Sequence, residues 1–94
     1  ITGRNAEVCS PYPIDEKWKA FGWSVASVDG HNIAELRKVL KETPVAQGKP
    51  TIIIANTIKG KGVSYMEDVK KWHHGVPSDE EYAQAIKELE AELI

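Results

Sequence analysis

Two short stretches of the chain combine residue types that could bind a phosphorylated ligand. The first, Lys59-Gly60-Lys61-Gly62, has lysines that can donate to phosphate and glycines that let the backbone pass close to a ligand. The second, Trp72-His73-His74-Gly75, has a histidine pair whose side chains can titrate near neutral pH. Together the two stretches predict a site for a phosphorylated ligand.

The lysine and glycine stretch is a weak signal when it is taken alone, because glycine-rich turns with surface lysines are common. It is not a P-loop, since apolar strand residues precede Lys59 where that motif needs its glycines. It also lacks the third glycine of a dinucleotide fingerprint. A glycine-rich turn without a ligand therefore stays open as an alternative.

The histidines are better suited to hydrogen bonding than to metal binding. Adjacent histidines such as His73 and His74 point apart on either a helix or a strand, and no acidic or sulfur ligand lies at a recognised spacing. We expect a hydrogen-bond donor to a phosphate or substrate hydroxyl, or a proton carrier. The remaining histidine, His31, lies in a turn before a helix cap, so we expect a structural role for it.

Two predicted strands and a helix must position these residues. The β-branched run at 51–55 is typical of a strand buried on both faces, and residues 23–28 favour a second strand. Between them, Asn32 and Glu35 predict a helix start in which each side chain binds the backbone N–H of the other residue. The apolar residues at helical spacing predict a buried stripe of Ile33, Leu36, Val39 and Leu40.

This order of strand, helix and strand predicts a βαβ unit with parallel strands and a right-handed crossover. Ligands gather at the carboxyl ends of parallel strands. The segments that emerge there are 29–32 and 57–60, so both polar turns should lie at one edge of the sheet.

The flanking segments complete an α/β fold. Residues 1–13 have the composition of an extended loop, and Pro13 and Gly22 bound a short helix. Near the end of the chain, Ser78 and Glu81 predict a capped helix with a buried apolar stripe of Tyr82, Ile86, Leu89 and Leu93. The expected order after residue 13 is helix, strand, helix, strand, loop and C-terminal helix. We expect Trp18, Phe21 and Trp23 to serve core packing or a subunit contact.

Composition narrows the function classes. The 94 residues are 41% hydrophobic and 28% charged, which is ordinary for a globular domain. A net charge of −2 with no basic block disfavours nucleic-acid binding, and no apolar run reaches the length of a membrane span. The single Cys9 fits a reducing, cytoplasmic setting, and no flanking base would activate it as a nucleophile. The start at Ile1, without methionine, suggests a piece of a longer protein.

Longer strings in the chain resemble a known family. The string AFGW-x-V-x-x-VDGH, from Ala20 to His31, is followed by KPT-x-I-I-A-x-T-x-KGKG, from Lys49 to Gly62, and then by Trp72-His73. Taken together, these strings resemble transketolase, and more narrowly the amino-terminal subunit of two-subunit bacterial transketolases. The resemblance covers nearly the whole chain, residues 1–94, as the carboxyl-terminal third of the thiamine diphosphate-binding PP domain.

The resemblance implies an activity and a cofactor. Transketolases transfer a two-carbon ketol unit from a ketose phosphate to an aldose phosphate, with thiamine diphosphate as the electron sink. It implies that Lys59, Gly60 and His73 bind the cofactor and that His73 is also catalytic, near the cofactor diphosphate and the substrate's terminal hydroxyl. Spacing from Lys59 favours His73, whereas the glycine and proline that follow favour His74; we assign the role to His73.

The resemblance also implies that parts of the site lie elsewhere. The Mg²⁺ or Ca²⁺ ligands are expected in a preceding part of the same subunit, so no metal ligand is assigned here. A transketolase C-terminal subunit would activate the cofactor and bind the sugar phosphates of the pentose phosphate pathway, in a heterooligomer. The isolated chain is expected to be inactive. Two alternatives remain, namely another thiamine diphosphate enzyme such as 1-deoxyxylulose-5-phosphate synthase, and a non-catalytic α/β interaction fragment.

Overall fold

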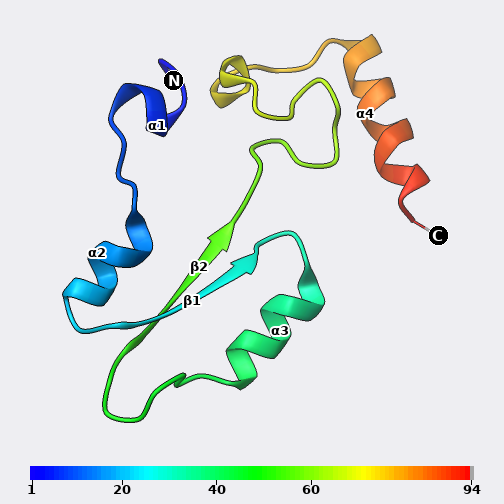
Figure 1. Ribbon diagram of the computed structural model, residues 1–94. Helices are drawn as coiled ribbons and strands as arrows, with labels where there is room; N and C mark the ends of the chain where they lie inside the picture. Colours follow the sequence, from blue (N-terminus) through cyan, green and yellow to red (C-terminus); the bar gives the residue numbers. More distant parts are fainter. Residues whose placement is uncertain (94) are drawn as a thin grey trace. The chain divides into compact units, whose positions relative to one another are not determined.

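The computed structural model describes residues 1–93, and the chain divides into two compact parts. We call Asn5–Thr57 the βαβ part. The second part, which we call the loop–helix part, combines Ile1–Arg4 with the chain from Ile58 onward. Each part is described by itself below, with the element labels of Figure 1.

The centre of the βαβ part is a sheet of two parallel strands, β1 (Ser24–Asp29) and β2 (Thr51–Asn56). Helix α3 (Ile33–Lys41) connects the strands and packs on β1 (Figure 1). This arrangement confirms the predicted α/β unit with parallel strands. Strand β1 begins and ends one residue later than the expected 23–28, and β2 extends one residue beyond the expected 51–55, to Asn56.

The register of the sheet aligns the carboxyl ends of the two strands. Asp29 is the partner of Asn56, and the Gly30 N–H donates to the Asn56 carbonyl at 2.8 Å. The Asn56 side-chain amide also donates to the Ser27 hydroxyl at 2.9 Å and to the Val28 carbonyl at 3.2 Å. The two strands therefore end at one edge of the sheet, as predicted.

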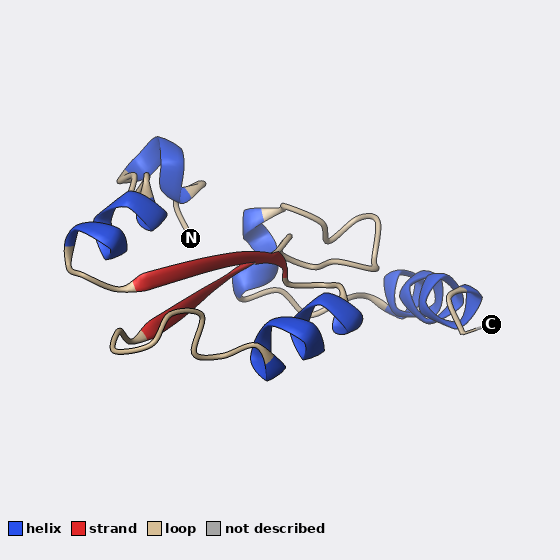
Figure 2. Cartoon of the chain, turned by 60° about the horizontal axis from the view of Figure 1, so that its bottom comes forward, coloured by secondary structure: helices blue, strands red, loops and turns tan. Residues whose placement is uncertain are grey.

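Two short helices precede β1. Helix α2 (Ile14–Ala20) lies before β1 in the chain and contacts it (Figure 2). The helix ends before Gly22, whose φ of 89° is the left-handed conformation expected at a helix stop. Helix α1 (Asn5–Val8) differs from the extended loop expected for residues 1–13. A hydrogen bond from the Cys9 N–H to the Asn5 carbonyl, at 3.0 Å, closes this single turn.

The start of α3 departs from the predicted reciprocal cap in one bond. The Asn32 side chain accepts from the Glu35 N–H at 3.1 Å, as expected. The Glu35 carboxylate, however, accepts from the Asp29 N–H at 3.0 Å. The Asn32 N–H donates instead to the Asp29 carbonyl at 3.1 Å, because the turn at Gly30 brings that carbonyl within reach. Glu35 thus ties α3 to the end of β1.

Burial in the βαβ part is lower than the sequence predicts. Val39 is 7% exposed, but Ile33 and Leu40 of the same expected stripe are 74% and 63% exposed. Residues 51–54 are only half-buried, so the prediction of a strand buried on both faces is wrong for this chain. Of the two roles expected for Phe21, core packing does not hold within this chain, since that side chain is 80% exposed, and the subunit contact stays a prediction. Two strands and one crossover helix have too little surface to cover these side chains.

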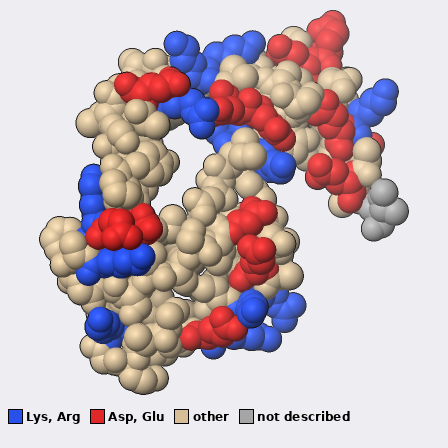
Figure 3. Space-filling view, in the orientation of Figure 1, with Lys and Arg blue, Asp and Glu red and all other residues tan. Residues whose placement is uncertain are grey.

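The loop–helix part has one regular helix and one short helical turn. Helix α4 (Asp79–Ala91) begins with the complete capping box predicted for Ser78 and Glu81, and the 3-10 helix η1 (Lys70–His73) lies in the preceding loop. The buried side chains in this part are Val63 and Ala85. The apolar stripe predicted for α4 is wrong in three places, since Tyr82 is 60%, Leu89 is 41% and Leu93 is 82% exposed. Acidic side chains gather over α4 (Figure 3).

Among residues 1–93, no helix has the length and apolar composition that crossing a membrane would require.

Candidate functional site

The Lys59-Gly60-Lys61-Gly62 stretch forms a tight turn after β2. Gly60 and Gly62 have φ values of 73° and 101°, in the left-handed region that favours glycine. The Lys61 N–H donates to the Ile58 carbonyl and the Val63 N–H to the Gly60 carbonyl, each at 3.2 Å. A Cβ atom on Gly60 would lie 2.5 Å from the Met66 carbonyl oxygen. Gly60 is therefore required by the fold of the turn.

The backbone N–H groups of the second half of the turn, and of the two residues that follow it, are used within the chain. Besides the Lys61 and Val63 amides, the Gly62 N–H donates to the Glu67 carboxylate at 3.2 Å and the Ser64 N–H to Glu88 at 2.7 Å. No hydrogen bond among residues 1–93 uses the amides of Lys59 and Gly60. Only the first half of the turn can thus offer backbone donors to an anion.

The Glu88 carboxylate of α4 anchors Ser64, which follows the turn. One of its oxygens accepts from the Ser64 hydroxyl at 2.5 Å and from the Gln84 amide at 3.0 Å, and the other accepts from the Ser64 N–H. The Ser64 hydroxyl, with smaller contributions from Gln84 and the Ser64 N–H, holds the pKa of Glu88 below its usual value. Helix α4 thereby fixes the loop that follows Lys59.

The Lys59 side chain is exposed, and no ion pair or hydrogen bond within residues 1–93 engages its ammonium. Its carbonyl accepts from the Asp68 N–H at 2.8 Å, and Asp68 in turn forms an ion pair with Arg4 at 3.3 Å. The nearby acid is therefore paired with another base. Lys59 presents a positive charge that a ligand phosphate could bind.

The histidine pair lies at the end of η1. His73 is the last residue of this helix and His74 caps it, with ring centroids 4.9 Å apart and an interplanar angle of 80°. Both side chains are exposed, and no hydrogen bond between described residues involves either ring. Their donors and acceptors are available to a ligand, and the geometry does not select one histidine over the other.

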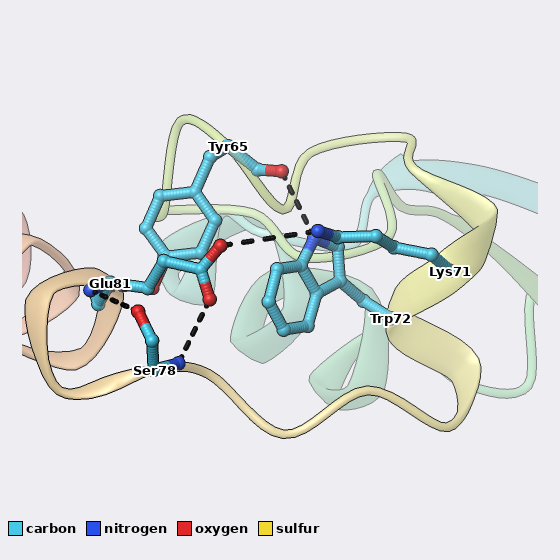
Figure 4. Close-up of polar contacts among 5 residues, drawn as sticks. All are labelled: Tyr65, Lys71, Trp72, Ser78 and Glu81. Carbon is cyan, nitrogen blue, oxygen red and sulfur yellow. Dashed lines mark hydrogen bonds and ion pairs between the residues drawn. The ribbon is translucent and has the colours of Figure 1, made fainter.

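The neighbouring Trp72 is held by a hydrogen bond and a ring contact to Tyr65 (Figure 4). Its indole N–H donates to the Tyr65 carbonyl at 3.1 Å, and the two rings have centroids 5.4 Å apart. The Tyr65 hydroxyl donates to the Glu81 carbonyl at 2.5 Å. Partial burial, together with the charges of Glu81 and Glu88, raises the pKa of Tyr65 above its usual value.

The candidate residues Lys59, Gly60 and His73 all belong to the loop–helix part. No hydrogen bond or ion pair within residues 1–93 joins Lys59 to His73. His31 lies outside this group, in the turn after β1, where its N–H donates to the Asp29 carboxylate at 2.9 Å. Sequence reasoning missed Ser64 and Glu88, because nothing in the pattern of α4 distinguishes Glu88 from the other acidic residues of that helix.

The available groups suit a phosphate better than a metal ion. A lysine ammonium, two backbone amides and an imidazole are donors, which is the chemistry that an anionic diphosphate needs. Within residues 1–93 no three His, Cys, Asp or Glu side chains gather as a metal site. Glu67 and Asp68, the acids closest in sequence to the turn, bind Gly62 and Arg4 instead. These residues therefore fit a diphosphate, and they do not fit its metal ion.

Comparison with known families identifies a match over most of the chain. Residues 3–91 match the model of the transketolase thiamine diphosphate-binding domain. This finding confirms the resemblance inferred from the AFGW, VDGH and KGKG strings.

Individual relatives agree with the family match. The chain is 40% identical over 89 residues to one of the named subunits of the apulose-4-phosphate transketolase of Phocaeicola vulgatus, covering 95% of this chain and 32% of that protein. It is 42% identical to the 6-deoxy-6-sulfo-D-fructose transketolase subunit SqwG of a Clostridium species, covering 98% and 34%. The transketolase of Pongo abelii is 39% identical, covering 83% and 12%. The chain thus spans about a third or less of the length of these relatives.

Proposed function

The chain belongs to the family of transketolase thiamine diphosphate-binding domains, and we propose that it forms part of an enzyme that transfers a two-carbon ketol unit between sugar phosphates. The observation that carries the proposal is the turn after β2. It leaves the Lys59 ammonium and the amides of Lys59 and Gly60 without a partner among residues 1–93, while the later amides of the turn bind the chain itself. The comparisons give no support to the alternative of a 1-deoxyxylulose-5-phosphate synthase.

In this proposal, Lys59 and Gly60 hold the diphosphate of thiamine diphosphate. The ammonium offsets its negative charge, and the backbone amides donate hydrogen bonds to its oxygens. When bound, the cofactor supplies an electron sink for breaking a carbon–carbon bond. Its metal ion, Mg²⁺ or Ca²⁺, would be held by residues outside this chain.

His73 would act beside this diphosphate. An exposed imidazole with no internal hydrogen bond can donate to a phosphate oxygen, or it can move a proton to and from a substrate hydroxyl. His74 is the matched alternative, because it is the next residue in the chain and its side chain is also exposed. Substitution of each histidine separately distinguishes the two assignments.

The complete site needs further polypeptide. Two of the relatives are named as transketolase subunits, and the chain covers about a third of each, which supports a heterooligomer with a second subunit. We propose that the isolated chain is inactive and that the full enzyme works in the cytoplasm, in the pentose phosphate pathway. Calorimetry of the isolated chain with thiamine diphosphate should show no tight binding, and a tight complex would contradict this view.

The main test uses the assembled enzyme with a ketose phosphate donor and an aldose phosphate acceptor. We expect ketol transfer, and we expect Lys59→Ala and His73→Ala each to lower kcat/KM by about 10²-fold, the usual scale for a positioned proton-transfer or charged group. Lys49→Ala is the matched control, because Lys49 is an exposed loop lysine of the βαβ part, and it should stay near wild type. Pyruvate-dependent condensation in place of ketol transfer would refute the transketolase function.

A further inference from the structure

We propose that Trp72 is a positioning residue that sets the direction of the His73 side chain toward its ligand. This inference rests on the proposed function, because it assumes that His73 acts on the cofactor or substrate. Trp72 is the residue before His73 in η1, so any rotation of its backbone moves the imidazole directly.

The helix that presents His73 is weak by itself. It has four residues, and the main-chain bonds that join it to its flanking residues, from the Trp72 N–H to the Val69 carbonyl and from the His74 N–H to the Lys71 carbonyl, are each 3.3 Å long. Such short 3-10 turns have poor hydrogen-bond geometry. Since no hydrogen bond within residues 1–93 holds either imidazole, the direction of His73 depends on what fixes the backbone of η1.

Trp72 provides that restraint through several contacts. Its indole N–H donates to the Tyr65 carbonyl, and its ring packs against the Tyr65 ring. The Lys71 ammonium lies 4.5 Å from the centroid of the indole, a cation–π distance. The backbone after the histidines also packs against the indole. Gly75 lies so close to the ring that a Cβ atom on this residue would be 2.8 Å from Trp72 Cε3. The segment that holds both histidines is therefore folded against one ring.

The contacts of Trp72 continue to helix α4, as Figure 4 shows. The Tyr65 hydroxyl donates to the Glu81 carbonyl, and the Glu81 carboxylate lies 3.9 Å from the Lys71 ammonium. The same carboxylate accepts from the Ser78 N–H at 2.9 Å in the capping box. Tyr65, Lys71 and Trp72 are thus linked to the first turn of α4, which gives η1 a rigid support.

The test is a double-mutant cycle in the assembled enzyme, with Trp72→Phe, His73→Ala and the double variant. Phenylalanine keeps an aromatic ring but removes the indole N–H that binds the Tyr65 carbonyl. The affinity for thiamine diphosphate, measured by calorimetry, is read beside kcat and KM. We expect Trp72→Phe to weaken binding and to lower kcat, each by about tenfold, because small displacements of a positioned group are costly. In the His73→Ala background the same change should have little effect.

Matched controls separate positioning from general loss of structure. Trp23→Phe makes the same substitution in the βαβ part, where no hydrogen bond of the described chain uses the Trp23 indole, and it should leave both readouts unchanged. If Trp72→Phe fails to fold, Tyr65→Phe replaces it, because that variant removes only the hydroxyl bond to Glu81. Tyr82→Phe, on a 60% exposed side chain, is its control.

The outcomes distinguish this inference from the proposed function. Equal effects of Trp72→Phe with and without His73 would overturn the inference, since Trp72 would then be structural only. A His73→Ala enzyme with wild-type binding and kcat would overturn it as well. An assembly that neither binds thiamine diphosphate nor transfers a ketol unit would refute the proposed function, and the inference with it.

Discussion

The two parts of this chain are held together in different ways. In the βαβ part, the main chain dominates, with a parallel ladder from Ser24 and Thr51 to Asp29 and Asn56. In the loop–helix part, side chains bind the backbone of distant residues, as Glu88 does with Ser64. Trp72 and Tyr65 do the same over shorter separations.

This difference matters for the candidate functional residues, because all of them lie in the loop–helix part. The candidate residues Lys59, Gly60 and His73 lie in a turn and a short 3-10 helix of the second part, where no ladder fixes the backbone. Their geometry depends on a few side-chain contacts and on glycines in the left-handed region. Single substitutions should therefore disturb the loop–helix part more than comparable substitutions disturb the βαβ part.

The largest expected effect on stability comes from a comparison of Gly60→Ala in the loop–helix part with Gly48→Ala in the βαβ part. Gly60 and Gly48 both have positive φ, at 73° and 78°, so alanine at either should cost about 1–2 kcal/mol of backbone strain. At Gly60 the new Cβ would also clash with Met66, whereas nothing lies within 4 Å of a Cβ on Gly48. We expect Gly60→Ala to cost about 3 kcal/mol or more. Hydrogen exchange around each site in the assembled enzyme measures the difference, and equal losses would contradict the contrast.

A smaller effect is expected at the two helix caps. Ser78→Ala and Asn32→Ala should each cost about 1 kcal/mol of local stability, because each removes one acceptor from a helix N-terminus. Substituting the glutamate three residues after each cap, Glu81 or Glu35, should have different effects in the two helices. Glu81→Ala should loosen the start of α4 and remove the ion pair with Lys71 of η1, whereas Glu35→Ala should speed exchange of the Asp29 amide at the end of β1. If Glu35→Ala left the Asp29 amide unaffected, the bond between helix and strand would be unimportant in solution.

The smallest effect is a pH dependence of the Ser64 loop. The pKa of Glu88 is lower in the folded chain than its ordinary value of 4.5, chiefly because the Ser64 hydroxyl donates to the carboxylate. Its stabilising contribution is therefore fully present above pH 4.5 and is lost as the pH falls through the lower folded value. Hydrogen exchange of the Ser64 amide, corrected for the intrinsic rate, should accelerate in that acidic range. Glu88→Gln should remove the acceleration, whereas Glu90→Gln, on an exposed residue of the same helix, should keep it.

Local patterns were sufficient to predict the order of the elements. Periodicity and turn residues placed α2, β1, α3, β2 and α4 close to their observed bounds, because each signal is confined to a few neighbouring residues. The same patterns overestimated burial. They showed which side chains are apolar, but Ile33, Leu40 and Leu93 are exposed because the chain supplies few elements to cover them.

The sequence by itself determined the parallel βαβ unit, the glycines of the Lys59 turn and the membership of the transketolase family. Only the tertiary structure decided which donors of that turn remain available. Glu88 is 24 residues from Ser64 along the chain, and no periodic pattern encodes a bond over that separation. Such bonds form only when the fold brings the partners within about 3 Å. Because the later amides of the turn are used in this way, those of Lys59 and Gly60 remain as its donors.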